Sequence, residues 1–64
     1  MDNDIMGRRY VATDAPTTEW VVDDEVQTDT NVRHVRLLKS GEPSTSKLIA
    51  VNALKDKRLY RMVG

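Results

Sequence analysis

The chain lacks cysteine and phenylalanine altogether, and its 64 residues include only one tryptophan and two tyrosines. Without cysteine there is no disulfide framework, no thiolate zinc site and no cysteine nucleophile. With so few aromatic residues, the core must be built mainly from Val, Leu and Ile, with the aromatic side chains at its edges. The lack of cysteine also fits a reducing compartment, so we expect a cytoplasmic protein.

Long apolar segments are missing as well. No run approaches the roughly 18 apolar residues of a membrane helix, and the N-terminal "MDNDIMGRR" lacks the apolar centre of a signal peptide. We therefore expect no membrane partner. A chain of this size makes one small domain, and it buries only about 60% of the surface that it exposes when unfolded. Almost every large apolar side chain is then needed in the core, and little volume remains for a pocket.

Motifs for catalysis and for cofactor binding are also absent. The three glycines, Gly7, Gly41 and Gly64, form no phosphate-binding loop. The lone histidine, His34, has arginine neighbours where a general base needs an orienting carboxylate. The acidic run at residues 23–25 lies in an extended segment, where successive side chains point to opposite faces and cannot converge on a metal. We predict a non-enzymatic protein with no catalytic residue, no metal site and no cofactor.

What the sequence does contain is a series of short extended segments separated by turn signals, which is typical of a small all-β domain. Residues 1–6 carry no pattern and are expected to be flexible, so residues 7–64 form the predicted domain. The predicted strands cover residues 8–12, 19–26, 32–38, 47–52 and 58–63, with a short helical turn in "ALKDK" before the last one.

The two-residue period of a strand predicts which side chains point inward. In the second strand, Trp20, Val22 and Val26 share one face. In the third strand, Val35 and Leu37 point inward. The continuous apolar run "LIAV" in the fourth strand indicates burial on both sides, or a central position in the sheet.

The order and spacing of these elements resemble the layout of an SH3-like barrel. We therefore predict a mainly β fold, either a small five-stranded SH3-like barrel or an open antiparallel sheet, with a short helical turn before the last strand. The alternative is an α+β domain with a three-stranded sheet, in which residues 44–63 form one C-terminal helix that begins at Ser44, Thr45 or Ser46.

Charge is balanced over the whole chain but divided between its halves. Residues 1–31 carry eight acidic and two basic side chains, whereas residues 32–64 carry eight basic and two acidic ones. Either the acidic strands lie beside the basic ones and the charges pair across the sheet, or the basic half forms a surface for a partner. The predicted binding residues on that surface are Arg33, His34, Arg36, Lys55, Lys57, Arg58, Tyr60 and Arg61.

The predicted function is a non-catalytic accessory or adaptor module that binds another protein through this basic C-terminal face or through a sheet edge. Trp20, Tyr10 and Tyr60 are natural anchors for a partner where they are exposed, and core packing is the other interpretation of Trp20. The alternative is direct nucleic-acid binding, with Tyr60 stacking on a base between Arg58 and Arg61. The neutral total charge disfavours nucleic acid. The division of charge permits self-association, so both a monomer and a small homo-oligomer agree with the sequence.

Overall fold

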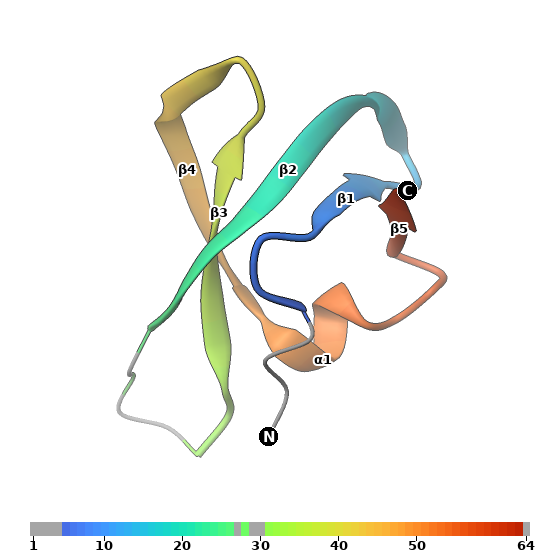
Figure 1. The fold of residues 1–64 in the computed structure, drawn as a ribbon. Helices are drawn as coiled ribbons and strands as arrows, with labels where there is room; N and C mark the ends of the chain where they lie inside the picture. Colours follow the sequence, from blue (N-terminus) through green and yellow to red (C-terminus); the bar gives the residue numbers. More distant parts are fainter. Residues whose placement is uncertain (1–4, 27, 29–30, 64) are drawn as a thin grey trace.

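Over the residues that the structure describes, the protein forms a five-stranded antiparallel sheet with a short α-helix before the last strand (Figure 1). The structure, a computed structural model, describes residues 5–26, 28 and 31–63. The strand order in the sheet is β4-β3-β2-β1-β5. The elements are β1 (Arg9–Ala12), β2 (Ala15–Val26), β3 (His34–Lys39), β4 (Glu42–Ala50), α1 (Val51–Leu54) and β5 (Tyr60–Val63).

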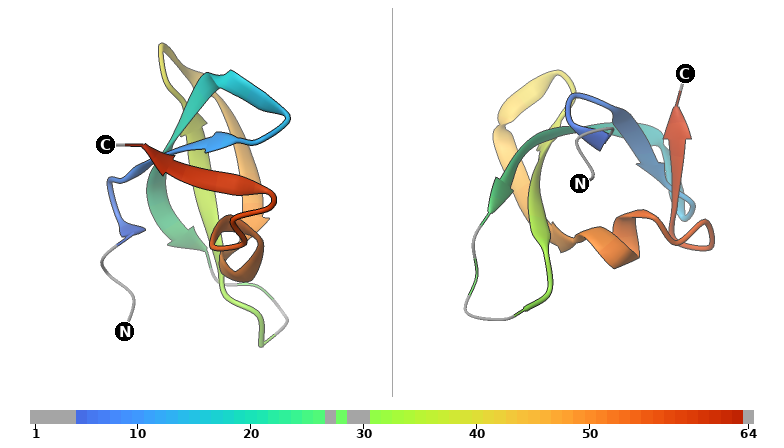
Figure 2. Two further views of the ribbon diagram at one scale, coloured as in Figure 1. Left: turned by 90° about the vertical axis from the view of Figure 1, so that its right-hand side faces the viewer. Right: turned by 60° about the horizontal axis from the view of Figure 1, so that its bottom comes forward.

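The predicted mainly β fold is confirmed in its open-sheet form. The sheet curls around its inner face (Figure 2), but β4 and β5 stay separate as its two edges, so the closed SH3-like barrel is not formed. The alternative helix over residues 44–63 is wrong. Its apolar side chains would have been scattered around the helix. In β4, by contrast, Ile49 lies directly opposite the buried Val35.

Two segments that lie between the predicted strands, residues 13–18 and 39–46, belong largely to strands. β2 begins at Ala15 and β4 begins at Glu42, so the connection between β3 and β4 is a tight turn. Gly41 occupies this turn with a φ of 87°, a left-handed conformation that glycine adopts without a Cβ clash. Near the start of both strands the pairing register skips a proline and two hydroxyl residues, 16–18 in β2 and 43–45 in β4. Proline is tolerated at such irregularities because no ladder hydrogen bond is required of it.

The core occupies the inner face of the curled sheet. Val22, Val35 and Leu37 form its centre and are at most 1% exposed, and Val22 lies directly opposite Leu37. The inward orientation predicted for Val35 and Leu37 is therefore confirmed. Val51 and Leu54 of α1 pack against the same cluster, so the helical turn closes one end of the core.

The N-terminal boundary of the packed chain differs from the prediction. Residues 1–4 of the segment expected to be flexible lie outside the described residues. Ile5, however, is 1% exposed within the core cluster, and Met6 packs against that cluster. A chain with so small a core includes the first apolar side chains that can reach it, so the packed part begins before residue 7.

Two predictions about strand faces are wrong. Trp20 lies on the inner face with Val22, but the register shifts between Val22 and Asp24 and brings Val26 opposite His34 on the outer face. A one-residue bulge exchanges the faces of every side chain that follows it. The "LIAV" run does not lie in a central strand: its first three residues end the edge strand β4, where Leu48 is 53% exposed, and Val51 begins α1.

Replacing Leu37 with alanine should lower the free energy of unfolding by about 2–5 kcal/mol, because it leaves a cavity in the middle of the core. The matched control is Leu48→Ala, which removes the same atoms from an exposed position and should change stability by less than about 0.5 kcal/mol. Urea unfolding followed by circular dichroism measures both. Similar losses for the two variants would show that the inner face is not the main source of stability.

Candidate functional site

The fold divides the predicted basic set into two groups. Arg33, His34 and Arg36 lie at the start of β3, whereas the remaining five residues follow α1 or belong to β5. Strands β2 and β1 separate β3 from β5 in the sheet. The two groups therefore belong to strands that are not neighbours in the sheet.

The first group faces the acidic strand β2. Arg33 donates two hydrogen bonds of 2.9 Å, from Nε and Nη2, to the two carboxylate oxygens of Glu25. Arg36 donates from Nε and Nη2 to one oxygen of Asp23, at 3.0 and 2.6 Å. His34 Nδ1 lies 2.9 Å from the carbonyl oxygen of Val32. For these arginines, the interpretation that charges pair across the sheet is confirmed.

The ion pairs also alter the acidity of two carboxyl groups. The side-chain hydrogen bonds from Arg33 lower the pKa of Glu25 below its usual 4.5; partial desolvation opposes this shift and the positive charge of Arg33 adds to it. Arg58 lowers the pKa of Asp56 in the same way, first through its guanidinium and then through its own backbone N–H. Arg58 is thus held by a carboxylate two residues before it, with an Nη2 to Oδ2 distance of 2.9 Å.

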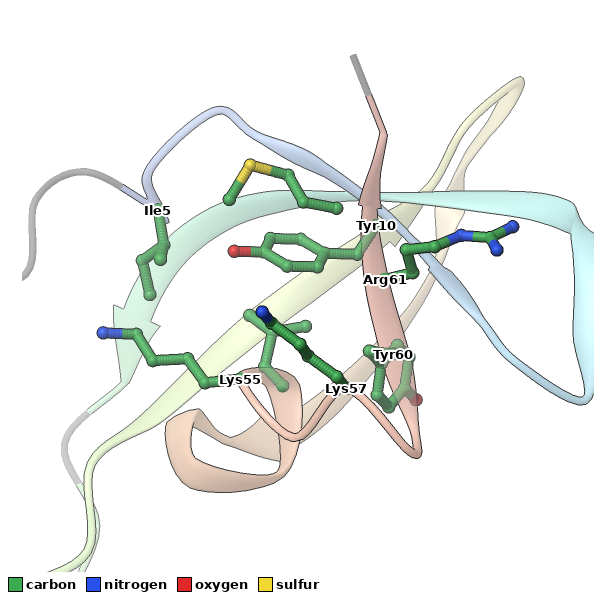
Figure 3. A pocket seen from close by; sticks show the side chains of 8 residues that line it. Ile5, Tyr10, Lys55, Lys57, Tyr60 and Arg61 are labelled. Atoms are coloured by element: carbon green, nitrogen blue, oxygen red, sulfur yellow. The ribbon is translucent and has the colours of Figure 1, made fainter.

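A pocket of about 500 Å³ lies between α1, β1 and β5 (Figure 3). We call it the apolar pocket. Two of the predicted cations, Lys57 and Arg61, line it and form no ion pair within the described part of the chain. The residues that line the apolar pocket are Ile5, Tyr10, Leu54, Lys55, Lys57, Tyr60, Arg61 and Met62.

The lining defines what the apolar pocket can bind. Its walls are aliphatic and aromatic, its charged lining residues are cationic, and none of the described lining residues carries a carboxylate or an imidazole. Such a pocket suits an apolar group with a negative charge beside it. Its volume lies in the range of small-ligand sites, so the expectation that so short a chain leaves little room for a pocket is wrong. The space lies beside α1, where Ile5, Tyr10 and β5 form its other walls.

A second hollow of about 470 Å³ shares Tyr60 with the apolar pocket. Its lining is more mixed in charge, because Asp14 and Arg58 both contribute to it, and Arg58 is already paired with Asp56. It therefore offers less net positive charge to a ligand than the apolar pocket does.

The three aromatic residues predicted as anchors differ in how deeply they are buried. Tyr10 is 4% exposed and belongs to the core cluster, so an exposed anchor at this position is excluded; it reaches only the wall of the apolar pocket. Trp20 is half-buried against the core, as the core-packing interpretation required. Tyr60 is half-buried and lines both hollows.

Sequence reasoning missed Lys47. Its ammonium lies 4.3 Å from the centre of the Trp20 ring and 5.1 Å from the centre of the Tyr60 ring. Lys47 lies opposite Leu37 in the register, so it shares the inner face. Its two-residue spacing from Ile49 in a strand was the available signal. The contact joins β4, β2 and β5 by cation–π attraction.

Within the described ranges, no group of three or more His, Asp or Glu side chains could hold a metal ion. The same ranges contain no helix long and apolar enough to cross a membrane. No family model, curated protein or solved structure matches this chain.

Because the pKa of Glu25 is lowered in the folded chain, its ion pair stabilises the fold above the pKa of the unfolded chain. That stabilisation is lost as pH falls through the folded pKa. Replacing Arg33 with glutamine should return the pKa of Glu25 toward 4.5 and reduce the acid-side loss of stability. NMR titration of the Glu25 side-chain carboxyl carbon measures the shift, and Lys39→Gln is a control that leaves Glu25 unchanged. An unaltered Glu25 titration in Arg33→Gln would contradict the bidentate pair.

Proposed function

We propose that this protein is a non-catalytic accessory or adaptor module that binds a segment of another protein at the apolar pocket. The main support for the proposal is the position of the two cations that form no described ion pair within the chain. Lys57 and Arg61 are free of described carboxylates, and both line the apolar pocket. An apolar side chain of the partner would fill the pocket, and an acidic neighbour would lie against these cations.

The same geometry favours a protein over a nucleic acid. Phosphate binding requires several cations spaced along a backbone, but Arg33, Arg36 and Arg58 are each neutralised by a carboxylate of the same chain. Base stacking requires an open aromatic face. The Tyr60 ring is half-buried and has the Lys47 ammonium 5.1 Å from its centre.

The expected affinity is modest. Burying one large apolar side chain contributes about 1.5–3 kcal/mol, and each exposed ion pair adds about 0.2–1 kcal/mol. Main-chain ordering of the partner opposes these gains. Micromolar to millimolar dissociation constants are therefore expected for a short segment, which suits an accessory contact inside a larger assembly.

Selection of a displayed library of random linear peptides tests this proposal. The wild-type protein should enrich peptides in which a large apolar residue adjoins acidic residues. The Lys57→Gln, Arg61→Gln double variant should bind the best peptide about tenfold more weakly, because two charge contacts are lost. Fluorescence anisotropy of the labelled peptide measures both affinities.

The matched control removes two charges of β3 that do not line the apolar pocket, by Arg36→Gln and Lys39→Gln, and should bind like the wild type. An equal loss in both double variants, or no enrichment at all, would contradict the proposed site. Labelled single-stranded and duplex oligonucleotides at two salt concentrations form a separate arm. Tight binding that weakens steeply with salt and depends on Lys57 and Arg61 would favour the nucleic-acid alternative instead.

A further inference from the structure

We infer that the partner segment binds as an extended strand along the free edge of β5, with alternate residues acidic and apolar. This inference rests on the proposed function and specifies how the same site recognises its partner. It follows from three features: the way the apolar pocket meets β5, the direction of the β5 backbone groups, and the positions of the cations.

The apolar pocket reaches the edge of β5. It is lined by three consecutive residues of that strand, Tyr60, Arg61 and Met62. Side chains of successive strand residues point to opposite faces, and in Figure 3 the Arg61 side chain extends away from the other labelled side chains. The apolar pocket therefore lies directly against β5, the strand at whose free edge an added strand would lie.

The hydrogen-bond pattern between β1 and β5 directs some backbone groups of β5 toward its free edge. Thr13 N–H donates to the carbonyl oxygen of Leu59 at 2.9 Å, one step beyond the Ala12–Tyr60 pair of the β1–β5 register. Antiparallel pairs alternate between bonded and non-bonded, so Arg61 bonds to β1. The backbone groups of Tyr60 and Met62 then point away from β1.

Two further hydrogen bonds agree with this direction. Val22 N–H donates to the carbonyl oxygen of Arg8. By alternation along the β1–β2 register, the backbone groups of even-numbered β1 residues bond to β2, and those of odd-numbered residues point to β5. Tyr60 N–H donates to the carbonyl oxygen of Asp56, on the side away from β1. The edge therefore offers one donor and two acceptors to a partner: the N–H and C=O of Met62 and the C=O of Tyr60.

The side chains around the edge determine the chemistry of the partner. A residue placed opposite Met62 shares its face and points to the apolar pocket, so it should be aliphatic. Met62 itself is 46% exposed, and this partner residue would cover part of its side chain. The next residue lies on the face of Arg61, which is exposed, and should be acidic. Main-chain bonds would supply affinity, and the alternating side chains would supply specificity, as in other strand additions.

The other edge lacks these features. β4 begins with Glu42 and Pro43, and proline and charged residues discourage pairing at an edge. Its one cation beyond that start, Lys47, points inward to Trp20 and Tyr60. No described residue before Ile49 in β4 lines either hollow. The β5 edge is thus the one that combines free backbone groups, a pocket and cations.

NMR spectroscopy of the isotope-labelled protein tests the inference at millimolar peptide, where weak binding is visible. The probe is a seven-residue peptide of alternating glutamate and valine, and its control replaces every glutamate with lysine. The acidic peptide should shift the amide signals of residues 60–63 and slow hydrogen exchange of the Met62 amide. The lysine peptide should do neither.

Two variants separate strand addition from simple filling of the pocket. Met62→Ala removes the side chain and keeps the N–H. Met62→Pro removes both, and it leaves the bonds to β1 intact because the N–H of residue 62 points to the free edge. Binding should be about tenfold weaker for Met62→Pro than for Met62→Ala, since main-chain hydrogen bonds are lost. Thermal unfolding of both variants checks that they remain folded.

Equal binding by the two folded variants, with shifts confined to pocket residues such as Tyr10 and Leu54, would overturn strand addition while supporting the proposed pocket. An absence of shifts from both peptides at millimolar concentration would overturn strand addition as well. The proposed function has its own separate result, which is the peptide selection with the Lys57→Gln, Arg61→Gln variant.

Discussion

A single small sheet has to cover its own apolar face, and the rest of this structure follows from that constraint. No second layer is present in the described chain, so the inner face is buried by curling the sheet and by placing α1 across one end. Val22, Val35 and Leu37 lie at the centre of the curl with at most 1% exposure. Hydrophobic burial is the main favourable term in folding, and in a domain this size it must come from these few side chains.

The curl brings together strands that are far apart in the sheet. Lys47 of edge strand β4 contacts Trp20 of β2 and Tyr60 of edge strand β5. A lysine can occupy the inner face because its stem packs like an aliphatic chain while its ammonium is attracted to two ring faces. The two edges approach one another without pairing. The space that remains beside α1 and β5 becomes the apolar pocket.

The same arrangement decides which charges remain for a partner. Antiparallel pairing places acidic β2 beside basic β3, so Asp23 and Glu25 neutralise Arg36 and Arg33. Surface pairs of this kind contribute little to stability, but they remove these arginines from any cationic surface. The cations after α1 have fewer acidic neighbours because β5 lies at the opposite edge from β4 and next to β1. The unequal distribution of charge along the sequence thus leaves a small local excess of positive charge at the β5 edge.

The sequence by itself determined the class of the fold. Its strand-like runs, its turn residues and the inward positions of Val35 and Leu37 follow from a two-residue period that needs no tertiary information. It also singled out Lys57, Tyr60 and Arg61 by charge and aromatic character, and these three residues line the apolar pocket of the proposed site. The limits of β2 and β4 were less predictable, because proline and hydroxyl residues are typical of loops. In this fold they lie within strands, at positions where the pairing register is irregular.

Only the tertiary structure decided which of the basic residues share a surface and which apolar side chains lie inside. The bulge at Asp23 reversed the face of Val26, and Ile5 joined the core from a segment without any pattern. Neither outcome is encoded locally, because strand register, sheet order and curl are set by the burial of the whole inner face at once. Local periodicity predicts that successive side chains point to opposite faces of a strand. The pairing of strands distant in sequence determines which residues each side chain contacts.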